Sequence, residues 1–437
     1  MKKRYLHLDF KGIVPRMPEL KKYLQFFHDC GFDGVVLEFD CRLSYKTFPG
    51  TGMPLFSTDE AKEIVKFAEL LGFETIPLMQ IHGHLEWLLG DEKYASLREN
   101  GKLTLCPSNP ESLKKLGEWM RELREIFPRS EYIHLGADEV TAIGECPLCA
   151  PRMEKEGKAG IYTAHVVKCC KMAAGLGFRP LIWADMLLKE FSCDAVRELP
   201  ADVIIVDWQY WGAGPYPTTE KLQKSGREVW GASAVRSAWY EHPYSILNFP
   251  EDRLENVSGW NHFDGNVIHT CWGRPGNKWN LYPPWILSLP VFIAAGNPQK
   301  WAVHPWKERY EKLNTILRRN LHFEVKKTLD MLGEWEAETP FEKEFLHFLK
   351  LGIRFQLLID GYLEYLFSKR MLESTAKFVG RDDFTYQSYI GDYPAKLQKD
   401  HAELMADIAD GFDRCQFSDK EEYIAEKTAV FDCLEKR

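Results

Sequence analysis

The feature that most constrains the fold is a repeated alternation of short apolar runs with longer segments of helical periodicity. Several helical segments open with Ser, Thr or Pro and close with Gly. This alternation is typical of parallel strands joined by helical crossovers, and eight repeats in about 300 residues predict a closed (β/α)8 barrel, the TIM barrel. The predicted strands are Tyr5 to Phe10, Gly34 to Phe39, Thr75 to Met79, Tyr132 to Leu135, Pro180 to Trp183, Val203 to Val206, Glu228 to Gly231 and Asn266 to Cys271.

The pattern changes after Pro305, where strand-like runs stop and long, charged, amphipathic stretches begin. We therefore predict a barrel that carries any catalytic site over residues 1–304 and an all-helical C-terminal region over residues 305–437. This region either packs against the barrel or makes a dimer, so we expect a monomer or a homodimer through the C-terminal helices. The predicted helices are Pro18 to Cys30, Asp59 to Leu71, Pro110 to Phe127, Ile161 to Leu176 and Thr218 to Ser225 in the barrel, and Trp306 to Leu332, Pro340 to Met371, Tyr389 to Phe412 and Asp419 to Leu434 after it.

The charge balance argues against a polyanionic partner. The net charge is -8 and the isoelectric point is near 6.0, whereas binding to a phosphate backbone needs clustered Lys and Arg. We therefore expect no nucleic-acid partner, and a neutral substrate fits better. The predicted strand ends also lack a phosphate cradle, and we predict no cofactor.

The sequence predicts a cytoplasmic protein that does not associate with membranes. Met1-Lys2-Lys3-Arg4 resembles the start of a signal peptide, but Asp9 and Lys11 interrupt the apolar stretch that would have to follow. No uninterrupted apolar run approaches the roughly 20 residues needed to span a bilayer. In that compartment the eleven cysteines are expected to be reduced thiols rather than a disulfide framework.

Chemically capable side chains gather directly after the predicted strands. In a barrel of this kind the active site lies at the carboxyl ends of the strands, so these positions carry the functional signal. They are Asp9 and Lys11 after the first strand, Glu38, Asp40 and Arg42 after the second, Gln80, His82 and His84 after the third, Asp138 and Glu139 after the fourth, Trp183 and Asp185 after the fifth, Asp207, Trp208, Tyr210 and Trp211 after the sixth, Trp230 after the seventh, and Trp272 and Arg274 after the eighth.

Tryptophan at four successive strand ends indicates a carbohydrate substrate. Flat aromatic walls suit sugar rings, whose C–H faces stack on them. Any single Trp is more often a packing residue, but Trp183, Trp208, Trp230 and Trp272 recur at equivalent positions. We therefore predict a sugar-binding pocket walled by these side chains.

The adjacent pair Asp138 and Glu139 indicates one particular mechanism of glycoside hydrolysis. Glycosidases that use two protein carboxyl groups place them on opposite sides of the scissile bond, about 5 Å apart for retention or further apart for inversion. Sequence neighbours seldom flank a bond in that way. The pair better suits a mechanism in which the 2-acetamido oxygen of the substrate is the nucleophile and forms an oxazolinium intermediate. Glu139 would then be the acid/base, and Asp138 would orient the acetamido group.

The segment His134 to Glu139 resembles the His-x-Gly-(Ala/Gly)-Asp-Glu signature of glycoside hydrolase family 20, the β-N-acetylhexosaminidases. Ile76-Pro77 through Gly83-His84 and Trp183-Ala184-Asp185 resemble two further segments of that family, and the resemblance covers roughly residues 5 to 300. It implies that Asp138 is the polarising carboxylate and Glu139 the acid/base. It also implies that the walls of the sugar pocket are Trp183, Trp208 and Trp272.

The chain departs from the family pattern where the sugar hydroxyls and the acetamido carbonyl are bound. It reads Leu8-Asp9-Phe10-Lys11-Gly12 where better-known members begin the barrel with an Arg, and Trp230-Gly231-Ala232-Ser233 where they carry Tyr-x-Asp. Tyr210 is our candidate for the missing tyrosine. With these departures the chain resembles the short, single-barrel hexosaminidase D-like branch of the family. The resemblance implies an intracellular protein that tends to favour galactosamine-type substrates. The predicted substrate-binding residues are Trp183, Trp208, Tyr210, Trp272, His84, Asp40, Lys11, Glu38, Asp185 and Trp230.

Possible metal ligands are less convincing. Cys146-Pro147-Leu148-Cys149 has the spacing of a metal-binding pair, but the nearest following pair, Cys169-Cys170, is adjacent on a helix, where neighbouring side chains diverge. We therefore predict ordinary thiols and no metal site. His82 and His84 have no evident third ligand, and we expect His84 to contact the sugar or to pair with Asp40.

Two alternatives to a β-N-acetylhexosaminidase remain open from sequence. A β-glycosidase for sugars without an acetamido group needs a second carboxylate opposite Glu139, with Asp207 or Glu38 as nominees. A non-catalytic sugar-binding barrel would keep the aromatic pocket, but a decayed site is not expected to retain both Asp138 and Glu139. The predicted reaction removes terminal β-linked N-acetylgalactosamine or N-acetylglucosamine.

Overall fold

A computed structural model gives the fold and describes residues 2–190, 193–236, 250–273, 284–311, 328–330, 332–379 and 393–435. Its centre is a sheet of eight parallel strands in the order β3-β2-β1-β10-β9-β8-β7-β6. A parallel bridge between Leu78 and His134 and a hydrogen bond from Met79 N to His134 O (2.9 Å) join the two outermost strands, so the sheet closes on itself. The predicted (β/α)8 barrel is confirmed. Its strands are β1 (Arg4–Asp9), β2 (Gly34–Glu38), β3 (Glu74–Pro77), β6 (Tyr132–His134), β7 (Arg179–Trp183), β8 (Ile204–Trp208), β9 (Val229–Arg236) and β10 (Val267–Cys271).

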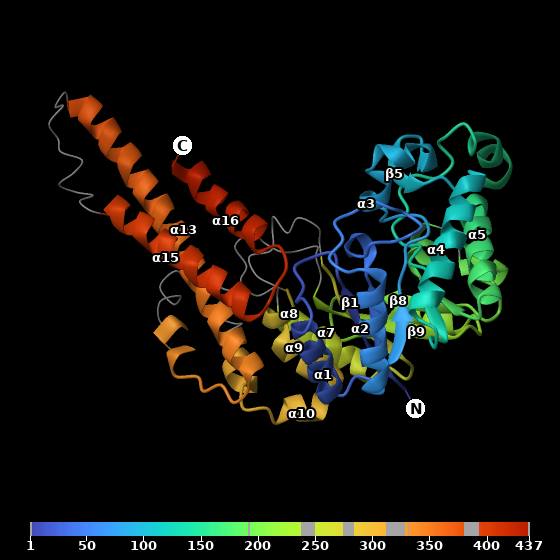
Figure 1. The fold of residues 1–437 in the computed structure, drawn as a ribbon, viewed down its shortest axis with the longest axis horizontal. Helices are drawn as coiled ribbons and strands as arrows, with labels where there is room; N and C mark the ends of the chain where they lie inside the picture. The colour runs from blue at the N-terminus through green and yellow to red at the C-terminus, as the bar shows by residue number, and fades with distance from the viewer. Residues whose placement is uncertain are drawn as a thin grey trace.

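Helices surround the sheet in the order that the alternation predicts (Figure 1). Ser57 begins α2 with a capping box to Glu60, and Asn109 caps α4 ahead of Pro110, so local sequence signals fix these starts. The helices of the barrel are α1 (Glu19–Cys30), α2 (Thr58–Leu70), α4 (Pro110–Ile126), α5 (Ala150–Gly175), α6 (Pro217–Gln223), α7 (Pro250–Asn261), α8 (Pro284–Leu287), α9 (Leu289–Gly296) and α10 (Pro298–Ala302), with short turns η1 (Asp40–Arg42), η3 (Met186–Glu190) and η4 (Cys193–Glu198).

Two predicted elements of the barrel differ from the observed bounds by five residues or more. Helix α5 begins at Ala150, eleven residues before the predicted Ile161, and bends at Gly157, whose φ of 65° interrupts the periodicity that sequence analysis follows. Strand β9 runs on to Arg236, whereas the predicted strand stops at Gly231. The small residues Gly231 to Ala234 hid the continuation, because they lack the large apolar side chains that mark a strand.

An excursion between β3 and α4 was not predicted. It contains α3 (Glu86–Leu89), η2 (Glu92–Leu97) and an antiparallel hairpin of β4 (Arg98–Glu99) with β5 (Lys102–Leu105). The hairpin is held to the barrel by a hydrogen bond from Leu105 N to His82 O (2.9 Å). Its two strands are too short for alternation to reveal them.

The barrel interior and the helical shell form separate apolar cores. The interior core contains Tyr5, Ile76, Trp183, Val206 and Trp230, among other side chains that point inward from the strands. The larger core lies between the strands and the helices around them. Because successive strand residues face opposite sides, every strand of the barrel except β3 contributes to both cores.

Helices α13 (Pro340–Val379), α15 (Tyr393–Arg414) and α16 (Lys420–Glu435) extend to one side of the barrel (Figure 1). They confirm the predicted helical character of the C-terminal region, while residues 312–327 of the predicted helix Trp306 to Leu332 lie outside the described residues. The division at residues 304 and 305 stays a prediction. None of the helices in the described ranges is long and apolar enough to cross a membrane.

The end of the chain packs against the first loop of the barrel. Ser418 exchanges hydrogen bonds with Val14, and Arg16 N donates to Gln416 O (2.9 Å). Arg42, after β2, pairs with Asp419 at 2.6 Å. The helical region was predicted either to pack against the barrel or to make a dimer, and these contacts show that it packs against the barrel.

Gly231→Ala tests the packing of α7 on β9. A Cβ at this position would lie 2.1 Å from the buried ring of Trp260, which has no room to move, so we expect a loss of at least about 2 kcal/mol in the free energy of unfolding measured with urea. The matched control is Gly175→Ala at the end of α5, where a Cβ meets nothing within 4 Å. Equal stability of the two variants would contradict this packing.

Candidate active site

The turn that follows β6 has an unusual backbone. Gly136, Ala137 and Glu139 all have positive φ angles, of 60°, 72° and 46°. Three hydrogen bonds hold the turn: Gly136 N donates to His134 Nδ1 (3.1 Å), Trp183 N to Gly136 O (3.0 Å), and the Tyr162 hydroxyl to Ala137 O (2.8 Å). His134 therefore supports the turn from the strand below.

Positive φ angles at non-glycine residues concentrate around this turn. Besides Ala137 and Glu139, they occur at Asp40 (46°) and His84 (54°), which end the loops after β2 and β3. Each such residue costs of order 1 kcal/mol or more and persists only where its surroundings hold it. The strain lies at the carboxyl ends of neighbouring barrel strands, which is where a barrel enzyme places its site.

His84 joins the two predicted catalytic carboxylates. Its Nε2 lies 3.3 Å from Asp138 Oδ2 and 3.4 Å from Glu139 Oε2. Burial alone would lower the pKa of His84, but the charge of Asp138 and the hydrogen bonds to both carboxylates outweigh burial and raise this pKa to about 11. His84 is therefore a cation at neutral pH. The expected pairing of His84 with Asp40 is wrong, because the loop after β3 turns His84 toward β6.

Asp138 has one oxygen left for a ligand. Its side chain is largely buried, and among the described residues Oδ1 has no hydrogen-bond partner. A buried carboxylate oxygen without a donor is costly unless something else occupies the position. Glu139 is more open, with a side chain 33% exposed to solvent. The two neighbours thus differ in setting, one buried and oriented, the other reachable by water.

Asp185 fixes the backbone between the two carboxylates. Its Oδ2 accepts a hydrogen bond from Glu139 N at 3.0 Å. Burial, followed by the charge of Asp138, raises the pKa of Asp185 to about 7. Asp185 was predicted as a substrate-binding residue, and the structure gives it contacts to the Glu139 backbone and to Trp208.

Aromatic side chains from β7, β8 and β10 meet beside the turn. Trp272 Nε1 donates to the Tyr210 hydroxyl (3.0 Å), and the Trp272 ring lies 6.1 Å from that of Trp183. Trp208 packs on Tyr210 with ring centroids 5.1 Å apart. Burial raises the pKa of Tyr210 far above its usual value, so the hydroxyl keeps its proton. Four of the predicted sugar-binding residues therefore form one continuous aromatic group.

A buried ionic cluster lies beyond Trp272. Lys11 Nζ contacts Glu38 Oε1 (2.8 Å), Asp9 Oδ1 (3.1 Å) and Asp40 Oδ2 (3.2 Å), and His7 Nε2 lies 3.0 Å from Glu38 Oε2. Burial alone would raise the pKa of Glu38, but Lys11 and His7 hold it well below its usual value. Burial raises the pKa of Asp40 to about 7 against the pull of Lys11.

Trp272 connects this cluster to the rest of the site. Its ring lies 4.6 Å from that of His7 and 5.8 Å from Lys11 Nζ. The structure thus brings together eleven of the predicted site residues in two adjoining groups. The first holds Asp138, Glu139, His84, Asp185, Trp183, Trp208, Tyr210 and Trp272, and the second holds Lys11, Glu38 and Asp40.

The placement predicted for Trp230 is wrong. Trp230 is the second residue of β9, so it lies at the amino end of that strand, fully buried and stacked on Tyr5 near the start of β1 (5.0 Å). Tyr132, which begins β6, packs against its other side (5.3 Å). Trp230 therefore belongs to the core at the opposite end of the barrel, and the error follows from the early end predicted for the strand. Arg274 lies outside the described residues.

One supporting residue was missed from sequence, and a second, Gln80, was named only as a side chain that follows the third strand. Tyr162 reaches Ala137 O from α5, and nothing in its local pattern separates it from an ordinary core tyrosine. Gln80 fills the space beside Gly136, where a Cβ would fall 1.9 Å from Gln80 Oε1. The glycine of the signature is thus required both by its φ angle and by this close contact.

Neither nominee for a separate nucleophile is available. Asp207 is buried and accepts hydrogen bonds from Thr218 (2.7 Å) and Thr219 (2.6 Å) of α6, so it faces the helices. Its neighbours in β8, Val206 and Trp208, belong to the barrel interior, as strand alternation requires. Glu38 is held by Lys11, His7 and Gln80.

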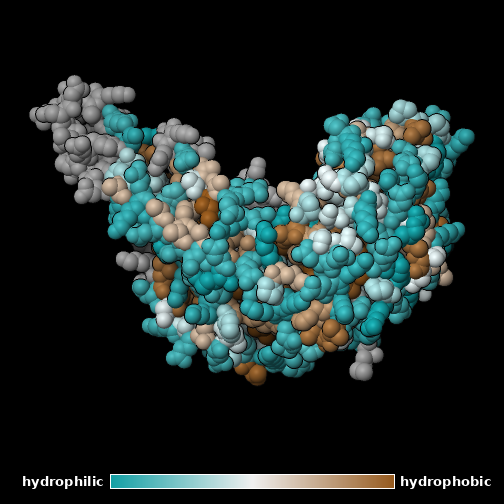
Figure 2. All heavy atoms as spheres, viewed as in Figure 1, coloured by the Kyte–Doolittle hydropathy of each residue, from teal (hydrophilic) through white to brown (hydrophobic). Residues whose placement is uncertain are grey.

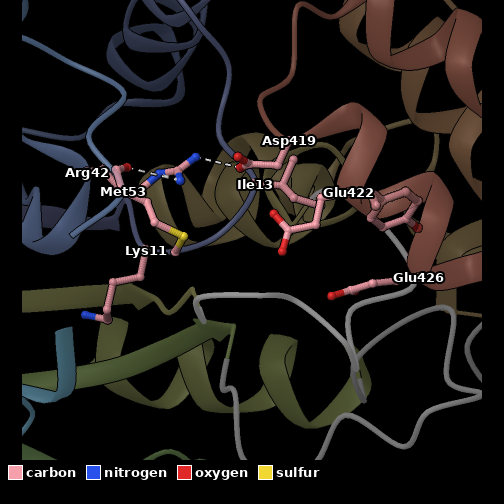
Figure 3. Close-up of a pocket in the computed structure, with 8 residues that line it drawn as sticks. Lys11, Ile13, Arg42, Met53, Asp419, Glu422 and Glu426 are labelled. Carbon is pink, nitrogen blue, oxygen red and sulfur yellow. Dashed lines mark hydrogen bonds and ion pairs between the residues drawn. The ribbon is translucent and has the colours of Figure 1, made fainter. Parts of the chain in front are cut away.

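A pocket adjoins the ionic cluster where the barrel meets the C-terminal helices (Figure 3). Lys11, Arg42 and Met53 line it from the barrel, and acidic residues including Asp419 and Glu422 line it from the other side. Seen as a whole, the molecule is hollowed between the C-terminal helices and the wall formed by β5, α3 and α5 (Figures 1 and 2). The candidate site is thus framed by parts of the chain that lie outside the eight strands.

The fold and these strand-end side chains define a (β/α)8-barrel glycoside hydrolase. Residues 15–245 match the model of the glycosyl hydrolase family 20 catalytic domain, which is more than half of the chain. The chain therefore belongs to glycosyl hydrolase family 20.

The chain is similar to proteins named hexosaminidase D. It is 30% identical to the one from Homo sapiens over 300 residues, which are 62% of this chain and 60% of that protein. It is 32% identical to the one from Bos taurus over 319 residues, which are 67% of this chain and 91% of that protein. A crystal structure of a β-N-acetylhexosaminidase from Bacteroides fragilis shares the fold, with a TM-score of 0.51 and 22% identity over 74% of this chain and 70% of that one.

His84→Asn tests the cation between the carboxylates. A histidine whose pKa rises on folding adds stability that is fully present below its unfolded pKa of about 6.5 and is lost as pH rises through the folded value. We expect the difference in the free energy of unfolding between wild type and variant to be constant just below pH 6.5 and to shrink steadily up to about pH 11. Denaturant titrations across this range measure it.

His28→Asn is the matched control. His28 lies 3.3 Å from Asp29 but on the surface, with a side chain 46% exposed, so solvent screens the pair and little change is expected at any pH. A pH-independent loss in His84→Asn would contradict the charged state assigned to His84.

Proposed function

We propose that this protein is an exo-β-N-acetylhexosaminidase that removes terminal β-linked N-acetylgalactosamine or N-acetylglucosamine by a retaining, substrate-assisted mechanism. The observation that carries the proposal is the pair Asp138 and Glu139, two neighbouring carboxylates of different exposure held by one histidine. The similarity to proteins named hexosaminidase D supports the same activity.

Asp138 orients the acetamido group in this proposal. Its oxygen Oδ1, which has no hydrogen-bond partner among the described residues, accepts the acetamido N–H, and this directs the carbonyl oxygen of the substrate toward the anomeric carbon. The new bond between that oxygen and the anomeric carbon closes the oxazolinium ring, and the glycosidic C–O bond breaks. The negative charge of Asp138 then stabilises the positive charge that develops on the ring.

Glu139 transfers the proton. It first donates a proton to the departing glycosidic oxygen. It then takes a proton from the water that attacks the anomeric carbon from the side on which the leaving group departed, and this attack opens the oxazolinium ring. Its exposure of 33% lets that water approach, and His84 and Asp185 hold its side chain and backbone in place. Two inversions at the anomeric carbon give overall retention.

Tyr210 and the tryptophans complete the sugar pocket. The Tyr210 hydroxyl accepts a hydrogen bond from Trp272 and keeps its own proton, so it is suited to donate to the acetamido carbonyl. Trp183, Trp208 and Trp272 form the apolar surface against the sugar ring. Lys11, whose Nζ lies 5.8 Å from the Trp272 ring, and the carboxylates around it supply charged groups beside this surface that can bind sugar hydroxyls.

The glycosidase with a separate carboxylate nucleophile is less well supported, because Asp207 and Glu38 are occupied elsewhere. A 2-fluoro glycoside would trap a covalent adduct on such a nucleophile. The proposed mechanism predicts no adduct and strong inhibition by a thiazoline mimic of the oxazolinium ring. A non-catalytic sugar-binding barrel would show no turnover of any aryl glycoside.

Glu139→Gln tests the acid/base. General acid–base catalysis contributes about 10²- to 10⁴-fold, so we expect kcat/KM to fall by that factor for a phenyl glycoside and by much less for a dinitrophenyl glycoside, whose departure needs no proton. Azide should restore turnover of the activated substrate and give the β-glycosyl azide. The control Glu125→Gln makes the same change on an exposed residue of α4 and should leave both rates near wild type. Equal losses with both leaving groups would rule out this role.

Asp138→Asn tests the orienting carboxylate. The interaction strengthens as charge develops on the oxazolinium ring, so we expect kcat to fall by at least about 10²-fold while KM changes little. Affinity for the thiazoline inhibitor should fall in parallel with kcat. If KM alone rises, Asp138 binds the ground state and the assignment fails.

A further inference from the structure

Four side chains with metal-binding atoms meet away from the sugar pocket. Glu99 of the β4–β5 hairpin, Cys106 just after it, and Cys146 and Cys149 before α5 each offer one such atom, and these atoms lie within 4.8 Å of one another. All four residues are buried, and the three thiols form a small cluster separate from the two main cores. We propose that these residues bind a structural zinc ion.

The separations between the sulfur atoms fit a tetrahedral metal site. Cys106 Sγ lies 3.4 Å from Cys146 Sγ and 3.6 Å from Cys149 Sγ. Thiolates at about 2.3 Å from a tetrahedral zinc ion are separated by roughly 3.8 Å, whereas a disulfide has an S–S bond of about 2.05 Å. The thiols are thus close enough to share one ion, and they are not bonded to one another.

Glu99 is oriented as a fourth ligand. Its Oε1 accepts hydrogen bonds from the backbone N–H groups of Glu145 and Cys146, both at 2.7 Å. These bonds leave Oε2 directed at the thiols, 3.1 Å from Cys149 Sγ. Carboxylates that bind metals are commonly held by hydrogen bonds of this kind, which fix the free oxygen toward the ion.

A bound cation would also neutralise the buried charge of Glu99. Glu99 is fully buried and makes no ion pair with a Lys, Arg or His in the described ranges. Burying a carboxylate without a counter-charge is costly, and zinc would supply one. Binding would release three thiol protons, and Arg152, held to Ser108 Oγ at 3.3 Å beside Cys149, lies near the resulting negative charge.

The local backbone already has the form of a binding turn. Cys149 N and Ala150 N both donate to Cys146 O, at 3.0 and 2.9 Å, so the two cysteines face the same side. Spacing alone pointed to Cys169-Cys170 as the second pair, but these lie in α5 outside the cluster. The ligands that join Cys146 and Cys149 come from the hairpin that was not predicted, which is why the sequence favoured ordinary thiols.

The zinc ion would fasten two loops that reach the candidate active site. Cys146 lies in the loop that begins with Asp138 and Glu139, and the hairpin bonds through Leu105 N to His82 O, two residues before His84. The ion would therefore hold in register the loops that carry His84 and its two carboxylate partners. This role does not depend on the sugar that the enzyme cleaves.

The first test is elemental analysis of the full chain, purified without a metal-affinity tag and without chelators. We expect about one zinc ion per chain. Cobalt exchanged into the protein should show the intense visible bands and the sulfur-to-metal charge transfer of a tetrahedral thiolate site. Native protein should resist alkylation at Cys106, Cys146 and Cys149 until a strong chelator is added. Zinc far below one equivalent with freely alkylated thiols, or a disulfide within the cluster, would overturn the proposal.

Variants locate the ion. Cys146→Ser and Cys149→Ser should each lose most of the zinc and lower the melting temperature, and a chelator should destabilise wild type but not these variants. Cys170→Ser, a buried thiol of α5 outside the cluster, is the matched control and should keep its zinc. Full zinc content in both cluster variants would also overturn the site. If a variant does not fold, the cobalt spectrum and the alkylation of wild type still decide.

Discussion

The candidate site depends on the hydrogen bonds that close the sheet between β3 and β6. These two strands are far apart in the sheet order and meet only because the barrel is closed. The bond from Met79 N to His134 O lies directly below the two loops that carry His84 and the Asp138-Glu139 pair. An open sheet of the same strands would place the histidine and the carboxylates at opposite edges. Barrel closure therefore brings these two separate loops together into one site.

The site separates its charges by burial. One carboxylate is buried with a free oxygen, its neighbour is open to water, and a histidine cation lies between them. On the far side of Trp272, Lys11 is surrounded by three carboxylates in a region with little solvent. Within this second set, Lys11 and His7 outweigh burial and lower the pKa of Glu38, whereas burial raises the pKa of Asp40.

Sequence predicted the barrel well because its strands are marked by large apolar side chains. Seven of the predicted runs lie on the observed strands to within two residues at each end, and Asp138 and Glu139 follow their strand as expected. The prediction failed where small residues carry a strand, so that Trp230 was assigned to the wrong end of β9. It also failed where a contact depends on long-range geometry. Neither the pairing of His84 with Asp138 nor the meeting of Cys106 with Cys146 leaves a local pattern.

The attachment of the chain end to the loop after β1 has a consequence for how the protein is made. Val14 N donates to Ser418 Oγ, a contact between residues 404 positions apart. Synthesis on the ribosome delivers the barrel strands first and this partner long after them. The hydrogen bonds of the loop that leads from Lys11 to Val14 are therefore complete only after Ser418 has been made. One side of the site is finished later than the strands, so a nascent barrel can be folded at its centre and still lack a completed pocket.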